Sequence, residues 1–284
     1  MIAAAVFPSF CAAALKDALS LCAGTLVPSL FLYIAASNLL SSCGAAAWAA
    51  DTAVGRAVSR ITGLSGAGTA AFLLGLAAGF PAGAIFLSDM AERGVISGRE
   101  AERLLPFANN CSPAFVIGAV GSLFGSVRFG VFLFLVQTAA SFAGAAVFAA
   151  DRGGRPVGRT CAPFPDLVSA FPKAVRDSVL SMLAICGFVA VFSVPCRALG
   201  GLGVAGAFMS GVLEIGNGCS AARMAGSRAA AAFAVGFSGL SVFFQVADTA
   251  SRGGIRTVYW LPAKLYSGIV CAAAAAAFDF FNLL

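Results

Sequence analysis

The spacing of charged residues constrains this chain more than any other feature. Four stretches contain no Asp, Glu, Lys or Arg, and each is about as long as the 20 residues that a helix needs to cross the hydrocarbon core of a bilayer. They run from Arg103 to Arg128, from Arg128 to Asp151, from Asp177 to Arg197 and from Arg228 to Asp248. The spacing therefore predicts at least four membrane-crossing helices.

The composition indicates the same class of protein. Hydrophobic residues make up 60% of the 284 residues and charged residues only 11%, whereas about 25% of a soluble domain is charged. We therefore expect an all-α, polytopic membrane helix bundle whose main partner is the lipid bilayer. The net charge of +6 comes from Lys and Arg in the connections, without interleaved aromatic residues, so no nucleic acid is expected as a partner.

Residues that catalyse reactions or hold metals are scarce. The chain has no histidine, which excludes Ser-His-Asp triads and His-ligated metal sites. The nine cysteines form no CxxC pair and lie mostly in apolar runs, as small buried side chains in a reducing compartment do. We therefore expect a protein that is not an enzyme and that binds neither a metal nor another cofactor.

Two longer uncharged stretches predict further helices. The stretch 17–51 predicts a helix around Leu21–Leu40, and the stretch 60–89 predicts a helix that is interrupted near Gly79–Pro81. Residues 1–15 are apolar but short, and we expect a short first membrane helix there rather than a cleaved signal peptide.

The chain divides into two membrane units. The segment 151–175 is rich in Lys, Arg, Pro and Gly, and it is predicted to be a polar linker between a first repeat at 1–150, which includes the N-terminal helix, and a second repeat at 176–284. Sliding the sequence on itself by 160 positions superimposes charged and glycine landmarks, including Gly79 on Gly239. Repeats with broken helices are typical of secondary transporters, and the sequence leaves open whether these repeats are inverted or parallel.

Clusters of Gly, Pro and polar residues interrupt the apolar runs at membrane depth. In lipid, backbone groups freed by Pro or Gly are tolerated only where protein or a water-filled cavity satisfies them, so we expect these clusters to face inward. The segments 44–62 and 200–222 are ambiguous, and each is compatible with a helix pair that enters the membrane and returns. Helix breaks are predicted at Gly79, Pro81, Gly83, Pro113, Gly216, Gly218 and Gly239.

The polar side chains of these clusters are the candidates for binding a solute. A carboxylate is costly inside a membrane, so Glu214 favours an ion path, a proton site or a buried pair over a solvent-facing position. Phe80, Phe243 and Phe244 are candidate apolar walls, and no Lys or Arg lies within the clusters. The competing interpretation is that the clusters only pack helices together. The predicted solute-binding residues are Asn109, Asn110, Ser112, Glu214, Asn217, Ser220, Ser238, Ser241 and Gln245.

Five motifs occur in a distinctive order and spacing. They are VPSLFLYI (27–34), GFPAGA (79–84), LLPFANNCSPAFVIGAVG (104–121), LEIGNGCSAA (213–222) and GFSGLSVFFQV (236–246). This arrangement resembles the sporulation integral membrane protein YlbJ family, within the nucleoside-recognition or Gate-domain group, over nearly the whole chain. The resemblance implies a protein of the outer forespore membrane that moves dipicolinate during spore formation. It also implies two repeats with helical hairpins, as in concentrative nucleoside transporters.

The leading functional hypothesis is a transporter of a small polar anion, which by the resemblance is dipicolinate. The alternatives are a nucleoside transporter and a non-transporting membrane scaffold of a sporulation complex. A membrane-embedded enzyme is disfavoured because the sequence shows no nucleophile with a base and no metal cage. A small-molecule solute is therefore the expected partner, and both a coupling ion and an oligomeric assembly are compatible with the sequence.

Overall fold

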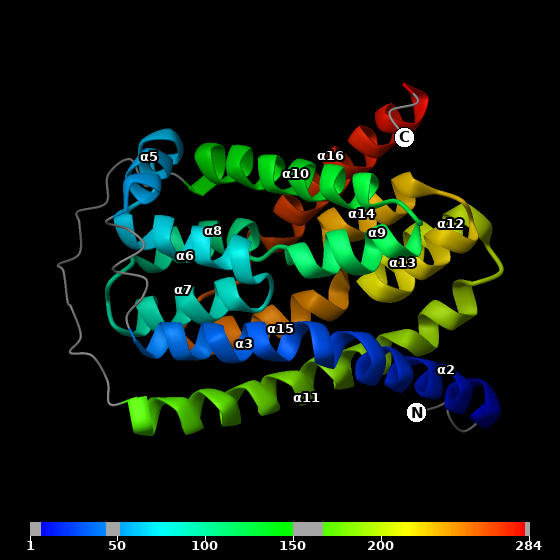
Figure 1. The fold of residues 1–284 in the computed structure, drawn as a ribbon, viewed down its shortest axis with the longest axis horizontal. Helices are drawn as coiled ribbons and strands as arrows, with labels where there is room; N and C mark the ends of the chain where they lie inside the picture. The colour runs from blue at the N-terminus through cyan, green and yellow to red at the C-terminus, as the bar shows by residue number, and fades with distance from the viewer. Residues whose placement is uncertain (1–6, 44–51, 150–166, 282–284) are drawn as a thin grey trace.

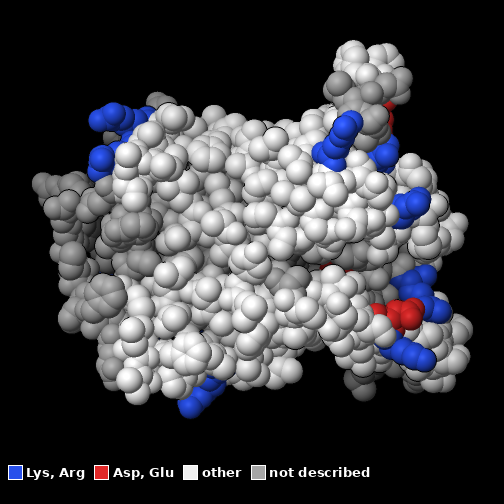
Figure 2. Space-filling model, in the orientation of Figure 1, with Lys and Arg blue, Asp and Glu red and all other residues white. Residues whose placement is uncertain are grey.

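The computed structural model describes residues 7–43, 52–149 and 167–281, and every regular element within these ranges is a helix (Figure 1). On the face shown in Figure 2, Lys, Arg, Asp and Glu gather toward the two ends of the long axis, and the band between them is formed by other residues. A band of this kind between charged ends fits a protein that crosses a bilayer along its long axis. The predicted all-α membrane bundle is confirmed.

A continuous helical run opens the described chain. It consists of α2 (Pro8–Leu21), a π-helical turn η1 (Cys22–Leu26) and α3 (Val27–Ser42). The boundary expected between a first helix at 1–15 and a second from Leu21 onward falls instead inside α2; residues 1–6 lie outside the described ranges. Pro28 has no N–H to bond to the preceding turn, and a wider turn just before it lets the helix continue.

The first half continues with a helix pair. Its elements are α5 (Ala53–Thr62), α6 (Gly66–Ala78) and α7 (Ala82–Glu92). Helices α6 and α7 pack against each other on either side of the turn Gly79–Pro81. Gly83, which was also predicted to lie at a break, lies inside α7 instead. A Cβ atom there would collide with the carbonyl oxygen of Ala108, so this glycine serves close packing against the end of α8.

A broken helix and a closing helix complete this half. They are α8 (Gly98–Ala108), then η2 (Ala114–Val120) with α9 (Gly121–Leu123), and finally α10 (Val127–Gly144) with η3 (Ala145–Ala149). Residues 109–113 separate α8 from η2, and Pro113 stands at the N-cap of η2. The stretch from Arg103 to Arg128 is therefore interrupted near its middle.

The second half has a similar order of elements, without a helix that corresponds to α5 in its described residues. They are α11 (Leu167–Leu199), α12 (Gly203–Leu213), α13 (Ile215–Met224), α14 (Arg228–Phe237), α15 (Gly239–Arg252) and α16 (Trp260–Phe280). Residues 167–175, predicted as the end of the linker, form the first turns of α11, and the part 151–166 lies outside the described ranges. Helices α12 and α13 form a pair that turns at Glu214, and Ser238 interrupts the span between α14 and α15.

The first long helices of the two halves lie side by side and run in opposite directions (Figure 1). Arg197 donates to Asp17 at 2.6 Å near one end, and the Asn38 amide donates to Ser178 at 2.9 Å near the other. Opposite directions are those of inverted rather than parallel repeats. The superposition of the two halves stays a prediction. By element order, the turn at Gly79–Pro81 in the first half corresponds to the turn at Glu214 in the second half. The offset of 160 positions instead pairs Gly79 with Gly239.

Five helices in the described ranges are long and apolar enough to cross a membrane, or six if the bent pair α5 and α6 is one span. They are Pro8–Leu26, Val127–Ala149, Leu167–Leu199, Arg228–Arg252 and Trp260–Phe280. The span Arg228–Arg252 is the most deeply enclosed, with 72% of its most apolar window buried. Small residues allow this: a Cβ atom on Gly236 of α14 would collide with the Ser267 carbonyl of α16.

Candidate functional site

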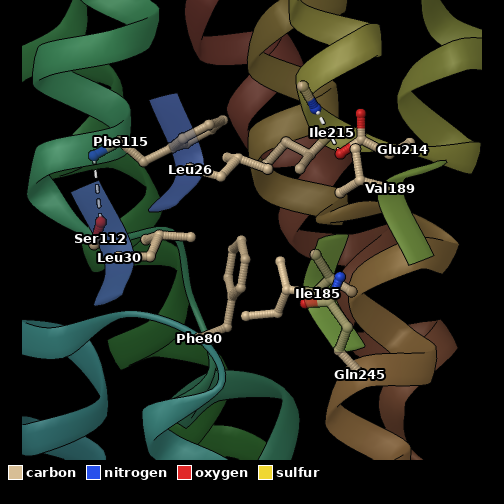
Figure 3. A pocket seen from close by; sticks show the side chains of 12 residues that line it. Leu26, Leu30, Phe80, Ser112, Phe115, Ile185, Val189, Glu214, Ile215 and Gln245 are labelled. Carbon is tan, nitrogen blue, oxygen red and sulfur yellow. Dashed lines mark hydrogen bonds between the residues drawn. The ribbon is translucent and has the colours of Figure 1, made fainter. Parts of the chain in front are cut away.

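The turns at Phe80 and Glu214, the break at Ser112 and the helix α15 border one cavity in the interior, which we call the central cavity (Figure 3). Figure 3 shows Ser112 and Phe115 on one side of it, Glu214 and Gln245 on the other, and the Phe80 ring pointing into it. Leu26, Leu30, Ile185, Val189, Ile215, Gly216 and Val242 complete the lining. Its volume is about 20 Å³. A single water molecule needs at least about 10–15 Å³ of such space, so the central cavity is closed around a very small volume.

A larger polar hollow, which we call the vestibule, lies next to the central cavity. Its volume is about 350 Å³, and Ile185 and Gln245 line both spaces. Other lining residues come from the end of α3, from α7, from the first half of α11 and from the end of α15. Its charged lining residues are Asp89, Glu92, Lys173, Asp177, Asp248 and Arg252. Ile185 and Gln245 therefore lie between the vestibule and the central cavity.

Glu214 forms the turn between α12 and α13 and caps the second of them. Its backbone is extended, with φ of −150° and ψ of 128°, and its side chain is buried. Its carboxylate accepts from the Gly216 N–H at 3.0 Å and from the Asn217 N–H at 2.6 Å, and the Asn217 amide adds a bond of 2.8 Å. All three contacts use the carboxylate as an acceptor at the positive end of a helix, which stabilises its charge inside the bundle.

The capping carboxylate also fixes where the helix breaks. The sequence places this break at Gly216 and Gly218, whereas both glycines lie inside α13 and the helical path stops at Glu214. A Cβ atom on Gly218 would collide with the backbone of Gly211 in α12. The break therefore comes from side-chain capping, and the glycine lets the two helices of the pair touch through their backbones.

The break at 109–113 is held by the two asparagines. The Asn109 side chain accepts from the Ala84 N–H at 2.9 Å and donates to the Leu105 carbonyl at 2.7 Å. Asn110 donates to the Phe107 carbonyl, and its side-chain oxygen accepts from Ser141 at 3.0 Å. Both amides are therefore used in joining α8 to its neighbours, and neither lines the central cavity.

Lys264 of α16 reaches the same break from the second half. Its ammonium donates to the carbonyl oxygen of Asn109 and, at 3.3 Å, to the side-chain oxygen of Asn110. It lies 5.1 Å from the centre of the Trp260 ring and is only 1% exposed. No Lys or Arg lies within the clusters themselves, but the fold brings this cation to one of them from another helix. The cation stands at the negative end of α8, where the helix dipole stabilises it.

Three of the nine predicted solute-binding residues line the central cavity: Ser112, Glu214 and Gln245. Ser220 is exposed on α13, and Asn217 holds Glu214 and donates to Ser193. The remaining four do not line the central cavity: Asn109, Asn110 and Ser238, which donates to the Val235 carbonyl, lie at helix breaks, and Ser241 accepts from Gln245 within α15.

Two of the three predicted aromatic walls lie elsewhere. Phe80 borders the central cavity, whereas Phe244 stacks on Phe188 of α11 and Phe243 packs against Trp260. Phe115 is an aromatic wall that sequence reasoning missed.

Lys264 was missed although the sequence contained a signal for it. It is the only ionisable Asp, Glu, Lys or Arg between Arg256 and Asp279, so the argument that singled out Glu214 applies to it equally. It lies two residues after Pro262 and close to a Gly- and Arg-rich connection, and this position favoured its interpretation as a charged residue of a loop. Gln137 was also missed: it exchanges two hydrogen bonds with the Cys111 backbone.

An ion pair joins the two halves outside the apolar spans. Arg256 donates to both carboxylate oxygens of Glu102, at 2.8 and 3.3 Å, and this holds the pKa of Glu102 below its ordinary value of 4.5. A carboxyl with a lowered folded pKa adds stability that is full above its unfolded pKa and is lost as the pH falls through the folded value.

We expect Glu102→Gln to remove this part of the acid dependence of unfolding. The loss at neutral pH should be small, about 0.2–1 kcal/mol, because the pair is partly exposed. Thermal unfolding of the wild type and the variant between about pH 3 and pH 7 measures this pH dependence, because the range includes the carboxyl pKa. Arg256→Gln should give the same profile, and different profiles for the two variants would contradict the assignment.

Comparison with known proteins gives one match. No protein-family model and no solved structure matches this chain. The chain is similar to the sporulation integral membrane protein YlbJ of Bacillus subtilis (strain 168), with 28% identity in an alignment that covers 76% of this chain and 64% of the relative. The chain thus spans somewhat less than two thirds of the relative's length. The similarity supports a family-level relationship, and with the five candidate spans it identifies an integral membrane protein.

Proposed function

Because the chain has a family-level relationship to a sporulation integral membrane protein, we propose that it is a membrane transporter that acts during spore formation. The observation that carries the proposal is the position of the vestibule next to the central cavity, with Ile185 and Gln245 lining both. Two half-helix pairs and two broken spans meet there, which is the arrangement that secondary transporters use for solute sites. A scaffold needs no such pair of internal spaces.

The proposed solute is a small polar anion, and the resemblance in the sequence motifs points to dipicolinate. Phe80 and Phe115 offer apolar walls for a planar ring, and the Ser112 hydroxyl offers a polar contact. A central cavity of about 20 Å³ is smaller than such a ring. Solute binding therefore requires the turns at Phe80 and Glu214 to move apart, as alternating access does in transporters.

Flux through the purified protein in liposomes tests this proposal. We expect uptake of labelled dipicolinate above the level of protein-free liposomes, saturating with concentration. Uptake of a labelled nucleoside without dipicolinate would overturn the choice of solute and keep the transporter. Uptake of neither solute, with protein inserted in the correct amount, would favour the scaffold.

A further inference from the structure

We propose that a monovalent metal cation binds where Ile185 and Gln245 separate the vestibule from the central cavity, a place that we call the neck, with the side-chain oxygen of Gln245 among its ligands. The cation would accompany the solute, and in that respect the inference rests on the proposed transport function. The binding itself is argued from the contacts and charges around the neck and is measurable without any flux.

Gln245 carries a buried oxygen that no protein donor satisfies. The residue is 6% exposed, and its amide N–H donates to Ser241 at 3.1 Å. The side-chain oxygen Oε1 is buried and has no hydrogen-bond partner among the described residues. Buried carbonyl oxygens are nearly always paired, so an unpaired one in the wall that two spaces share points to a ligand that carries positive charge or a donor.

The charges on both sides of the neck favour a cation. Glu214 lines the central cavity, and the vestibule is lined by four carboxylates against two basic side chains, Lys173 and Arg252. Asp248 pairs with Arg252 at 3.0 Å, and Asp89 pairs with Arg93 at 2.8 Å. The remaining excess is negative, and a negative cleft concentrates cations and repels anions.

The ligand set favours a single positive charge. Divalent cations are usually held by several carboxylates, and the described residues contain no group of three or more His, Cys, Asp or Glu side chains that could hold a metal. Here a neutral amide oxygen lies on the same wall as one carboxylate, Glu214. Neutral oxygens suit a hard ion such as Na⁺, and the volume of about 20 Å³ admits an ion with little of its water.

A bound cation also removes a conflict in the proposed function. An anionic solute that enters the central cavity meets the carboxylate of Glu214, and a dianion would be repelled. A monovalent cation at the neck neutralises that charge. Cation and anion should therefore each raise the affinity for the other.

Thermal unfolding of the full chain in detergent tests cation binding. Sodium chloride is titrated against choline chloride at constant total salt, so that only the cation changes. We expect the unfolding midpoint to rise and saturate with sodium, because a ligand that binds only the folded protein stabilises it. Gln245→Met should raise the half-maximal sodium concentration at least about tenfold. It also removes the hydrogen bond to Ser241, so the midpoint in choline should fall as well, and the sodium increment above that lower baseline is the quantity that tests the proposal.

Gln137→Met is the matched control, since the chain has only these two glutamines. Gln137 both donates to and accepts from the Cys111 backbone, so its replacement should lower the midpoint in choline and leave the sodium increment intact. Equal sodium increments in the wild type and Gln245→Met would overturn the proposal. So would stabilisation by dipicolinate in choline that disappears in Gln245→Met, because the neck would then take an anion.

The liposome experiment separates this inference from the transport proposal. Dipicolinate flux without a Gln245-dependent sodium increment would overturn the cation site and leave the transporter. A Gln245-dependent sodium increment without flux of either solute would leave the cation site and overturn the transporter.

Discussion

Glu214→Gln should reduce solute flux at least about tenfold while the protein remains inserted. A carboxamide keeps only one of the two acceptor oxygens, so an N–H of Gly216 or Asn217 loses its partner at the start of α13. An unsatisfied buried N–H costs about 1–3 kcal/mol, and the charge that lines the central cavity disappears as well. Flux in liposomes and the thermal unfolding midpoint measure the two effects separately.

Glu92→Gln is the matched control for that experiment. It removes the same charge from an exposed position in the vestibule and should change the unfolding midpoint little. Normal flux through Glu214→Gln over the whole working pH range would mean that Glu214 only caps its helix.

Lys264→Met should destabilise the fold by about 2–4 kcal/mol. Methionine fills similar space but leaves the Asn109 carbonyl and the Asn110 side-chain oxygen without their donor, in a place that water does not reach. The break between α8 and η2 then loses its link to α16, so flux should fall together with stability. Thermal unfolding in detergent measures the loss.

Lys173→Met provides the comparison for the lysine variant. Lys173 is exposed at the vestibule, and its replacement should stay within about 0.5 kcal/mol of the wild type. If Lys264→Met were as stable as Lys173→Met, the ammonium of Lys264 would not be holding the break.

Much of the fold follows from the sequence because charges and unpaired backbone groups have a large free-energy cost in lipid. Three of the four charge-free stretches accordingly coincide with candidate spans. The stretch from Arg103 to Arg128 is not among the candidate spans, because the break at 109–113 divides it. Helix boundaries are less accessible. The expected start of a second helix near Leu21 fails because a π-helical turn carries the chain past it without a break.

The site was accessible only in part, because a side chain's partner is decided by tertiary packing. Asn109, Asn110 and Ser112 follow one another in sequence, yet only Ser112 lines the central cavity, and the asparagines bond to α7, α8, α10 and α16. Burial of Glu214 follows from its cost in lipid. That its own carboxylate, and not a glycine, would form the turn is a matter of local capping geometry.

The glycine contacts within the helix pair α12–α13 have a mechanical consequence. The backbones of Gly211 and Gly218 touch with no layer of side chains between them, so the pair has nothing to compress or slide when it is pushed. The pair should therefore move as one rigid body. The pair also packs closely on Ala234 of α14 through the same two glycines, whereas α11 presents the branched side chains of Ile185 and Val189. We expect the contact with α11 to be the one that slides. The hinge would therefore lie at the ends of the helix pair α12–α13, and the pair would slide along α11.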